Sequence, residues 1–274
     1  MEKLNDNTIN ALIKPRAASS NKGNHGHALI VAGSKGKMGA CVIAAKACLR
    51  SGVGLLTVNV PNNERLILQT AIPEAMLIMR EDDIKNLNAY SSIGIGPGIG
   101  LTEKQKKIIR IILNKVTIPL LLDADALNII AANKNLLKKI PENTVITPHP
   151  IEFDRLFGTH HSHVERIKMA VELSKKYNIV IVLKGAKTLI TYKGEAVINT
   201  TGNAGLAKAG SGDALTGVIT AFLAQGYNSY NAAKLGVYLH GLSADIALEK
   251  QSMESMLITD VIECIGKAFK HIMN

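Results

Sequence analysis

Short, largely apolar segments alternate with predicted helices along most of this chain, and this alternation restricts the fold more than any other feature. The segments 27–32, 92–95, 119–122, 144–147 and 179–183 read as buried strands. Nearly continuous apolar runs of this length are typical of strands covered on both faces of a parallel sheet. We therefore expect an α/β protein whose mainly parallel sheet lies between two helical layers, in three αβα layers.

A hairpin and a single large core complete this expectation. Lys193 and Gly194 read as a tight turn with residues 195–199 as the return strand, so antiparallel strands are expected at one edge of the sheet. The chain has 274 residues and a hydrophobic content of 47%. Because α/β folds of this size are common as single units, we expect one domain over residues 1–274.

Composition excludes several classes of protein. No apolar run is long enough to cross a bilayer, and residues 1–20 lack an apolar signal region, which predicts a cytoplasmic protein. The three cysteines, Cys41, Cys48 and Cys264, form no CxxC pair, which argues against a disulfide framework and a zinc site.

The net charge of +10 fits either nucleic acid or an anionic small ligand. With 4% aromatic residues and no Trp, stacking platforms are scarce, so nucleic acid is not expected.

The stretch from Asn199 to Gly226 combines a glycine-rich loop with an apolar helix. The loop contains Gly202, Gly205, Gly210 and Gly212, and helical periodicity follows it. Glycine permits positive φ and a close approach of the backbone to a ligand. The first N–H groups of a helix have no acceptor inside the helix, so this stretch predicts an anion site.

Asp213 begins that helix, directly after Gly210, Ser211 and Gly212. One interpretation is a simple helix cap. The other is a general base, because a carboxylate beside a phosphate can take the proton from an attacking hydroxyl. The loop N–H groups would then stabilise charge on the transferred phosphoryl group. We favour the catalytic interpretation.

Two further glycine loops follow strands. The loop 33–40 has the spacing G-x-x-G-x-x-G and lacks an acidic residue about twenty positions later, so a Rossmann dinucleotide site is not expected. The loop 96–100, GPGIG, is either a tight connection or the backbone lining of a bulky ligand. Asp123 and Asp125 follow the strand 119–122, where open α/β sheets bind ligands. Asp125 reads as a helix cap, whereas Asp123 could hold a magnesium-bound water or a backbone loop.

Other polar segments also end strands. His149 lies between two prolines on a rigid loop, and taken alone it reads as a hydrogen-bonded or surface histidine. The basic segment 184–188, KGAKT, either suits a polyphosphate or is an ordinary connection. The histidines at 160, 161 and 163 read as solvated rather than metal-binding, before a capping box of Ser162 with Glu165.

Three motifs together resemble a known family. GNAGLAKAGSGDALTG resembles the signature loop of the ribokinase-like superfamily, and its closest branch is the ADP/ATP-dependent NAD(P)H-hydrate dehydratases. TPHPIEFDRL resembles that family's TPHP-x-E motif, which includes Glu152, and KGAKT resembles its nucleotide segment. The resemblance covers nearly the whole chain and implies a ribokinase-like fold. Ser211, Ala204 and Met38 stand where the family usually has threonine, proline and tyrosine.

The resemblance also implies two adjoining sub-sites. The substrate side would comprise Ala40, Gly98, Gly100, His149 and Asp213. The nucleotide side would comprise Lys184, Gly185, Ala186, Lys187, Thr188, Gly210, Ser211 and Gly212. ADP or ATP would be the co-substrate, with ADP favoured, and Mg²⁺ would bridge its phosphates without a dedicated protein site.

The implied activity is a hydro-lyase that repairs the S epimer of hydrated NADH and NADPH, by phosphorylating the ring hydroxyl and then losing phosphate. Family members that also interconvert the substrate epimers carry a second domain, for which these 274 residues leave no room. Two alternatives stay open: a kinase of a small metabolite such as a vitamin precursor, and a nucleotide-binding protein without turnover. The expected partners are small molecules, in a homo-oligomer, with no nucleic acid and no membrane.

Overall fold

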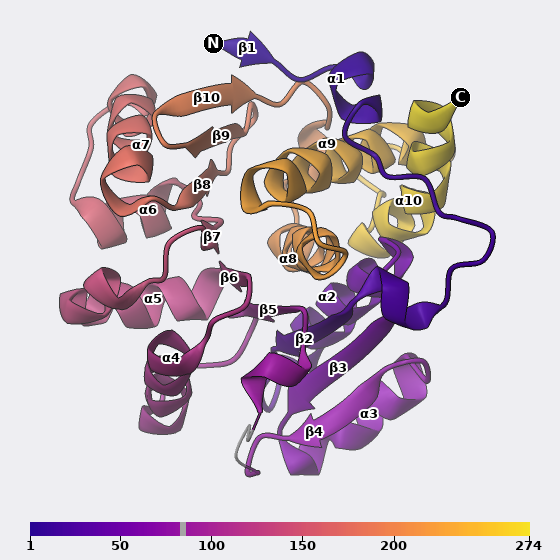
Figure 1. The fold of residues 1–274 in the computed structure, drawn as a ribbon. Coiled ribbons are helices and arrows are strands. Elements are labelled where there is room, and N and C mark those ends of the chain that lie inside the picture. The colour runs from indigo at the N-terminus through magenta and orange to yellow at the C-terminus, as the bar shows by residue number, and fades with distance from the viewer. Residues whose placement is uncertain (83–85) are drawn as a thin grey trace.

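A ten-stranded sheet runs through the protein, in the order β1-β10-β9-β8-β7-β6-β5-β2-β3-β4 (Figure 1). The computed structural model describes residues 1–82 and 86–274. The strands are β1 (Glu2–Lys3), β2 (His27–Val31), β3 (Leu55–Val60), β4 (Met76–Met79), β5 (Ser92–Ile95), β6 (Leu120–Leu122), β7 (Val145–Ile146), β8 (Val180–Leu183), β9 (Leu189–Tyr192) and β10 (Glu195–Ile198).

The central strands are parallel, as expected, and their order reverses once. From β2 the chain moves outward through β3 to β4, then returns to place β5 on the other side of β2. The strands β6, β7 and β8 continue from β5 in parallel. The carboxyl ends of β2 and β5 therefore border the point at which the strand order reverses, where open α/β sheets bind ligands.

Two helical layers cover the sheet, which confirms the three-layer α/β expectation. One face carries α4 (Glu103–Lys115), α5 (Ala124–Ala132), α6 (Pro150–Phe157) and α7 (His163–Tyr177). The other carries α2 (Met38–Arg50), α3 (Arg65–Ala71), α8 (Ser211–Ala224), α9 (Ser229–Ala247) and α10 (Ile258–Met273). Alternate residues of each strand face opposite layers, so that Leu29 and Ile30 of β2 belong to different cores.

Helix α8 lies unusually close to its neighbours because it is lined with small residues. A Cβ added at Gly217 would lie 2.0 Å from the carbonyl oxygen of Ala44 in α2. The contact therefore requires glycine, and it brings the first turn of α8 over the centre of the sheet. The start of α8 is thereby held beside the carboxyl ends of the parallel strands.

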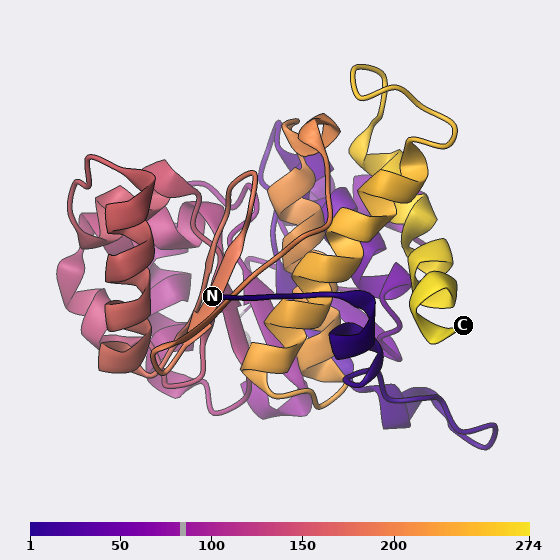
Figure 2. The ribbon, with the colours of Figure 1, turned by 90° about the horizontal axis from the view of Figure 1, so that it is seen from above.

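The hairpin is confirmed, with Lys193 and Gly194 at positive φ angles of 51° and 90°. Strand β9 pairs antiparallel with β8 and with β10. The N-terminal segment is joined to the fold, since β1 pairs with β10 and α1 (Asp6–Asn10) packs against α9 and α10. Figure 2 shows this segment crossing from the hairpin to these two helices.

The predicted capping box of Ser162 with Glu165 was wrong. Ser162 does accept from the Glu165 N–H group, but the Glu165 carboxylate accepts from the N–H group of His161 instead of Ser162. None of the helices within residues 1–82 and 86–274 is long and apolar enough to span a bilayer.

Candidate active site

The two early glycine loops meet where the strand order reverses. Val31 pairs with Ile95, so the loops that follow β2 and β5 lie side by side. The Gly33 N–H group donates to the Pro97 carbonyl at 2.8 Å, and the Ser34 hydroxyl donates to the Gly98 carbonyl at 2.7 Å. These two hydrogen bonds join the loops into one backbone surface. The hydrophobic periodicity of the sequence gave no sign of this contact.

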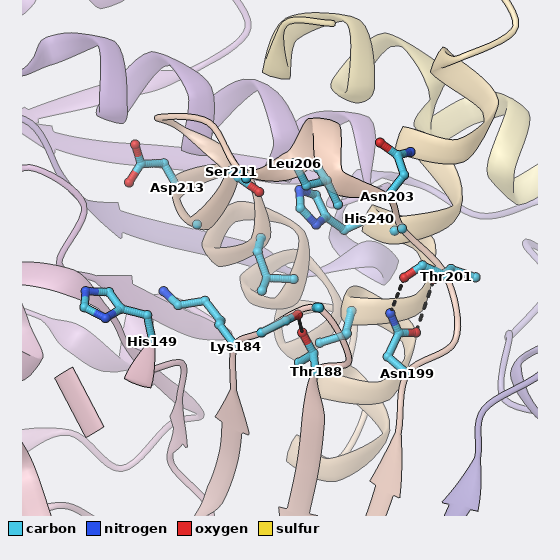
Figure 3. A pocket seen from close by; sticks show the side chains of 18 of the residues that line it. His149, Lys184, Thr188, Asn199, Thr201, Asn203, Leu206, Ser211, Asp213 and His240 are labelled. Carbon is cyan, nitrogen blue, oxygen red and sulfur yellow. Dashed lines mark hydrogen bonds between the residues drawn. The ribbon is translucent and has the colours of Figure 1, made fainter. Parts of the chain in front are cut away.

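A cavity of about 800 Å³ adjoins this surface. It is bounded by the ends of β6, β7 and β8, by the 199–207 loop, and by α8 and α9. Figure 3 shows His149, Lys184 and Asp213 at one end, with Asn199, Thr201 and Asn203 at the other. We call these the catalytic end and the loop end of the cavity.

The start of α8 forms one wall of the catalytic end. Gly210, at φ 94°, precedes the helix, and Ser211, Gly212 and Asp213 are its first three residues. The Ser211 N–H group already donates to the Lys208 carbonyl at 3.3 Å. The N–H groups of Gly212 and Asp213 have no carbonyl of α8 to reach, because the helix has only begun. They are the ones best placed to meet an anion.

The carboxyl group of Asp213 has a strongly raised pKa. Burial, followed by the nearby Asp123 and Asp125 carboxylates, raises the pKa of Asp213 to about 6, against the opposing effect of Lys184. Its side chain accepts no hydrogen bond that would mark it as a helix cap. A carboxyl group with a pKa near 6 is suited to general base catalysis at neutral pH.

Lys184 occupies the middle of the catalytic end. Its ammonium group lies 2.8 Å from Asp123 Oδ1 and 3.9 Å from Glu152 Oε2. Burial disfavours the charged form, but Asp123 and Glu152 outweigh it and raise the pKa of Lys184. Asp123 Oδ2 also accepts from the Thr216 hydroxyl at 2.9 Å. The lysine is therefore a fixed cation beside the start of α8, suited to a phosphate group.

Asp123 and Asp125 have different roles from those first considered. Helix α5 begins at Ala124, so the predicted cap at Asp125 was wrong and Asp123 holds the capping position, without a capping hydrogen bond. Asp125 instead accepts from the Gly100 N–H group at 2.8 Å. Asp125 thus fixes the loop after β5, and Asp123 fixes Lys184.

His149 caps α6 while its ring borders the cavity. Its Nδ1 accepts from the N–H groups of Ile151 and Glu152, at 3.1 and 3.3 Å. The Glu152 carboxylate accepts in return from the His149 N–H group at 2.9 Å, which completes a capping box. The ring is held in one orientation and leaves Nε2, 3.5 Å from Glu152 Oε1, as its other polar atom.

Three of the five expected substrate-side residues lie outside the wall of the cavity. Ala40, Gly98 and Gly100 do not line it, whereas His149 and Asp213 do. A Cβ added at Gly98 would lie 3.2 Å from that of Ala40, so these two residues face each other across the joined loops. The Asp213 carboxylate contributes to the raised pKa of Cys41, next to Ala40, so it lies within electrostatic reach of these loops.

The expected nucleotide segment lines the cavity with most of its residues. Lys184, Gly185, Ala186 and Thr188 contribute, together with Ser211 and Gly212, whereas Lys187 and Gly210 do not line it. The Thr188 hydroxyl donates to the Gly185 carbonyl at 3.2 Å and closes the turn (Figure 3). The basic segment therefore presents its small residues and Lys184 to the cavity, and Lys187 is exposed.

Helix α9 supplies functional residues that sequence reasoning missed. Asp245 accepts from the Gly202 N–H group at 2.7 Å and from Asn203 Nδ2 at 2.9 Å. The Thr201 hydroxyl donates to the Tyr238 carbonyl at 2.8 Å. These bonds pin the 199–207 loop to α9. His240 lines the cavity from the same helix, although its sequence context of apolar residues gave no sign of this.

The later histidines behave only partly as predicted. His161 and His163 are exposed, but His160 is largely buried and its Nδ1 lies 3.0 Å from Asp154 Oδ1. His160 was therefore wrongly assigned as solvated, because Asp154 and Arg166 hold it against α6. Within the part of the chain that the structure describes, no group of three or more His, Cys, Asp or Glu side chains is arranged to hold a metal ion.

Comparisons with known proteins agree with this geometry. A model of the NAD(P)H-hydrate dehydratase family matches residues 28–267. The chain is 33% identical over 272 residues to the ADP-dependent (S)-NAD(P)H-hydrate dehydratase of Bacillus subtilis, covering 96% of each chain. It is 34% identical over 273 residues to the bifunctional NAD(P)H-hydrate repair enzyme Nnr of Moorella thermoacetica, covering 94% of this chain and 52% of that protein.

The first relatives are longer than this chain, which spans about half of their length. A crystal structure of the Bacillus subtilis ADP/ATP-dependent NAD(P)H-hydrate dehydratase, co-crystallised with ATP and Mg²⁺, superposes with a TM-score of 0.90. That match has 31% sequence identity and covers 99% of this chain and 98% of the other. The three-layer sheet and the cavity at its carboxyl edge thus belong to a fold shared over nearly the whole chain.

Proposed function

The chain belongs to the NAD(P)H-hydrate dehydratase family, and we propose that it dehydrates the S epimer of hydrated NADH and NADPH at the expense of ADP or ATP. The observation that carries this proposal is the position of Asp213. Its carboxylate, with a pKa raised to about 6, stands at the start of α8 between Lys184 and the joined glycine loops. A base there can reach a hydroxyl that faces a bound phosphoryl group.

The first step is phosphoryl transfer. The ring hydroxyl of the hydrated nicotinamide gives its proton to Asp213, and its oxygen attacks the terminal phosphorus of the nucleotide. The bond from that phosphorus to the bridging oxygen breaks, so AMP leaves when ADP is the donor. Lys184 and the N–H groups of Gly212 and Asp213 stabilise the charge on the transferred group.

The second step is elimination. The bond between the ring carbon and the phosphate ester oxygen breaks, and its electron pair leaves with phosphate. The neighbouring ring carbon releases a proton, and the resulting double bond restores the dihydropyridine ring. The net reaction yields the repaired cofactor, phosphate and the shorter nucleotide, which makes the enzyme a hydro-lyase.

The nucleotide and the hydrated cofactor bind at two adjoining sub-sites. Lys184, Gly185, Ala186, Thr188, Ser211 and Gly212 hold the nucleotide, with Lys187 and Gly210 beside them. The substrate side uses Ala40, Gly98, Gly100, His149 and Asp213. Because Asp123 is already engaged by Lys184 and Thr216, Mg²⁺ would be held by the nucleotide phosphates, whose charge it neutralises when bound.

The remaining proposals concern the domain organisation, the location, the preferred nucleotide and the partners of the protein. We propose that residues 1–274 act as one domain in the cytoplasm, with ADP favoured over ATP, as the name of the Bacillus subtilis relative supports. The proposed partners are the two small-molecule substrates. A homo-oligomer without a nucleic-acid or membrane partner is part of the same proposal.

The test is a coupled assay on the purified protein with hydrated NADH and each nucleotide in turn. Dehydration restores absorbance at 340 nm with one phosphate released per cofactor. Phosphorylation of another small hydroxylated metabolite without this recovery would favour the kinase alternative, and nucleotide binding without any turnover would favour the third. Failure of the recovery with both nucleotides contradicts the proposed function.

Replacing the proposed base gives the sharpest single-residue test. We expect Asp213→Asn to lower turnover by about 10²–10⁴-fold with nucleotide affinity nearly unchanged. Asp260→Asn is the matched control, because Asp260 is likewise the third residue of a helix but caps α10. If Asp213 is only a helix cap, both variants will keep turnover close to that of the unsubstituted protein.

A further inference from the structure

His240 is a buried polar side chain without a partner. It is 6% exposed, and its Nε2 atom has no hydrogen-bond partner among residues 1–82 and 86–274. The residue nevertheless lines the cavity, and Figure 3 shows its ring between Ser211 and Asn203. An unsatisfied buried nitrogen costs free energy, so it calls for a partner that the isolated protein does not supply.

The cavity around His240 is shaped for an uncharged group. Val237 and Gly241 on the same helix, and Leu206 on the 199–207 loop, form apolar walls near it. The polar groups that suit phosphate, Lys184 and the start of α8, belong to the catalytic end. A nucleotide with its phosphates there would extend its sugar and base toward the loop end.

The ring itself is also uncharged. Burial and, to a lesser extent, the positive charge of Lys184 lower the pKa of His240 to about 4. A neutral imidazole has one donor and one acceptor nitrogen. That pair matches a ribose hydroxyl or the edge of a purine, whereas a phosphate would favour a charged ring.

The loop end is already built before a ligand arrives. Asp245 and the Tyr238 carbonyl hold Gly202, Asn203 and Thr201 against α9. A Cβ added at Gly241 would lie 2.4 Å from the Thr201 hydroxyl, so helix and loop are in close contact. A ligand at this end therefore meets a fixed wall in which His240 holds the unpaired nitrogen.

We propose that the imidazole of His240 hydrogen-bonds the nucleoside portion of the bound adenine nucleotide and so contributes to the choice of nucleotide. Binding would supply the partner that Nε2 lacks, after a small rotation of the ring toward the cavity. This inference rests on the proposed function only in requiring that the cavity accept a nucleotide. It assigns His240 to recognition, and it leaves the chemical step to Asp213.

The test measures ADP and inorganic pyrophosphate binding by calorimetry. We expect His240→Leu, which keeps the volume but removes both nitrogens, to weaken ADP binding about tenfold. His240→Gln, whose amide can reach the position of Nε2, should stay within about threefold of the unsubstituted protein. Neither variant should change pyrophosphate binding, because that probe has no nucleoside.

A second substitution in α9 serves as the control for His240→Leu. Ser243→Ala removes a buried hydroxyl from the same helix, which donates to the Leu239 carbonyl, and it should leave ADP binding unchanged. Equal weakening of ADP and pyrophosphate binding by His240→Leu, in a protein with an unchanged melting temperature, would overturn the inference. So would an unchanged ADP affinity.

The two proposals can also fail separately. If the protein binds ADP with the expected His240 dependence yet never restores 340-nm absorbance, only the proposed reaction is wrong. If it repairs the hydrated cofactor while His240→Leu binds ADP normally, only the recognition role is wrong. Absence of both ADP and ATP binding in the unsubstituted protein overturns both.

Discussion

At the scale of single residues, the catalytic end depends on carboxylates that are held in different states. Asp123 is fixed by Lys184 and Thr216 and serves as their anchor. Asp213 has no such partner within residues 1–82 and 86–274, and burial and neighbouring carboxylates raise its pKa to about 6. The same chemical group thus supplies a structural anchor at Asp123 and the proposed proton acceptor at Asp213, because the surroundings differ.

The pH dependence of turnover follows from Asp213. Its carboxylate must be ionised to accept a proton, so kcat/KM should rise with pH through about 6 and level off above neutrality, measured by phosphate release. The folded-state pKa lies above the usual value of 3.8, so this group makes the fold less stable as pH rises from about 4 to 6. Asp213→Asn should therefore melt no lower than the unsubstituted protein at pH 7.5. A rate independent of pH between 5 and 7 would argue against Asp213 as the base.

His149 is expected to act on the hydrated cofactor. His149→Ala should raise KM for that substrate more than KM for the nucleotide, because the ring borders the catalytic end on the side away from the 199–207 loop. The substitution also removes the α6 cap, at a cost of about 1 kcal/mol in stability. His149→Asn keeps a capping oxygen without the ring and separates the two effects. A rise confined to the nucleotide KM would show that the sub-sites are assigned in the wrong order.

At the scale of elements, the start of α8 and the end of β8 work as a pair. The Cβ position of Gly212 lies 3.3 Å from Lys184 Nζ and 3.6 Å from Asp123 Oδ2. The helix start is therefore in near contact with the cation that is proposed to bind the same phosphate. An added Cβ would be tight against Lys184, and the backbone angle does not by itself call for glycine, since Gly212 is not among the residues with positive φ.

Gly212→Ala should disturb the nucleotide without unfolding the protein. The added methyl group would press on the Lys184 ammonium group, so we expect weaker nucleotide affinity by calorimetry and slower turnover. Gly266→Ala in α10 is the matched control, because its Cβ meets open space. That control should be more stable by up to about 1 kcal/mol and should bind nucleotide normally. Unchanged nucleotide affinity in Gly212→Ala would show that this turn is not the phosphate site.

At the scale of the whole molecule, the order of the strands decides where each ligand can lie. The joined glycine loops occupy the carboxyl ends of β2 and β5, and the cavity occupies those of β6, β7 and β8. Helix α8 packs against β2, β5 and β6 at the centre of the sheet, which brings Asp213 close to both regions. In the proposed function, this one helix start acts on both substrates.

A crystal soaked with a non-hydrolysable ADP or ATP analogue tests this layout. We expect adenine density near residues 184–188 and the 199–207 loop, with the phosphates pointing toward Gly212. The apolar walls of the loop end and the cation at the catalytic end both favour that direction. Adenine density beside Ala40 would reverse the two sub-sites.

The sequence by itself determined the local features of this protein. These features are the apolar runs, the Lys193-Gly194 turn and the glycine loop before α8. Each depends on residues that are neighbours in the chain, so it can be predicted from a short stretch of sequence. The predicted capping box failed because the Glu165 carboxylate accepts from the N–H group of His161 instead of that of Ser162. The partner that such a side chain takes depends on small differences in side-chain geometry.

Only the tertiary structure decided which distant groups share the cavity. His240 and Asp245 are five residues apart on one helix, so their side chains point in different directions and their spacing indicates no shared site. Their partners come from the 199–207 loop and from the cavity, which packing brings to α9 over about forty residues of intervening chain. The raised pKa of Asp213 arises in the same way, because burial and the charges of Asp123 and Lys184 exist only once the strands are side by side.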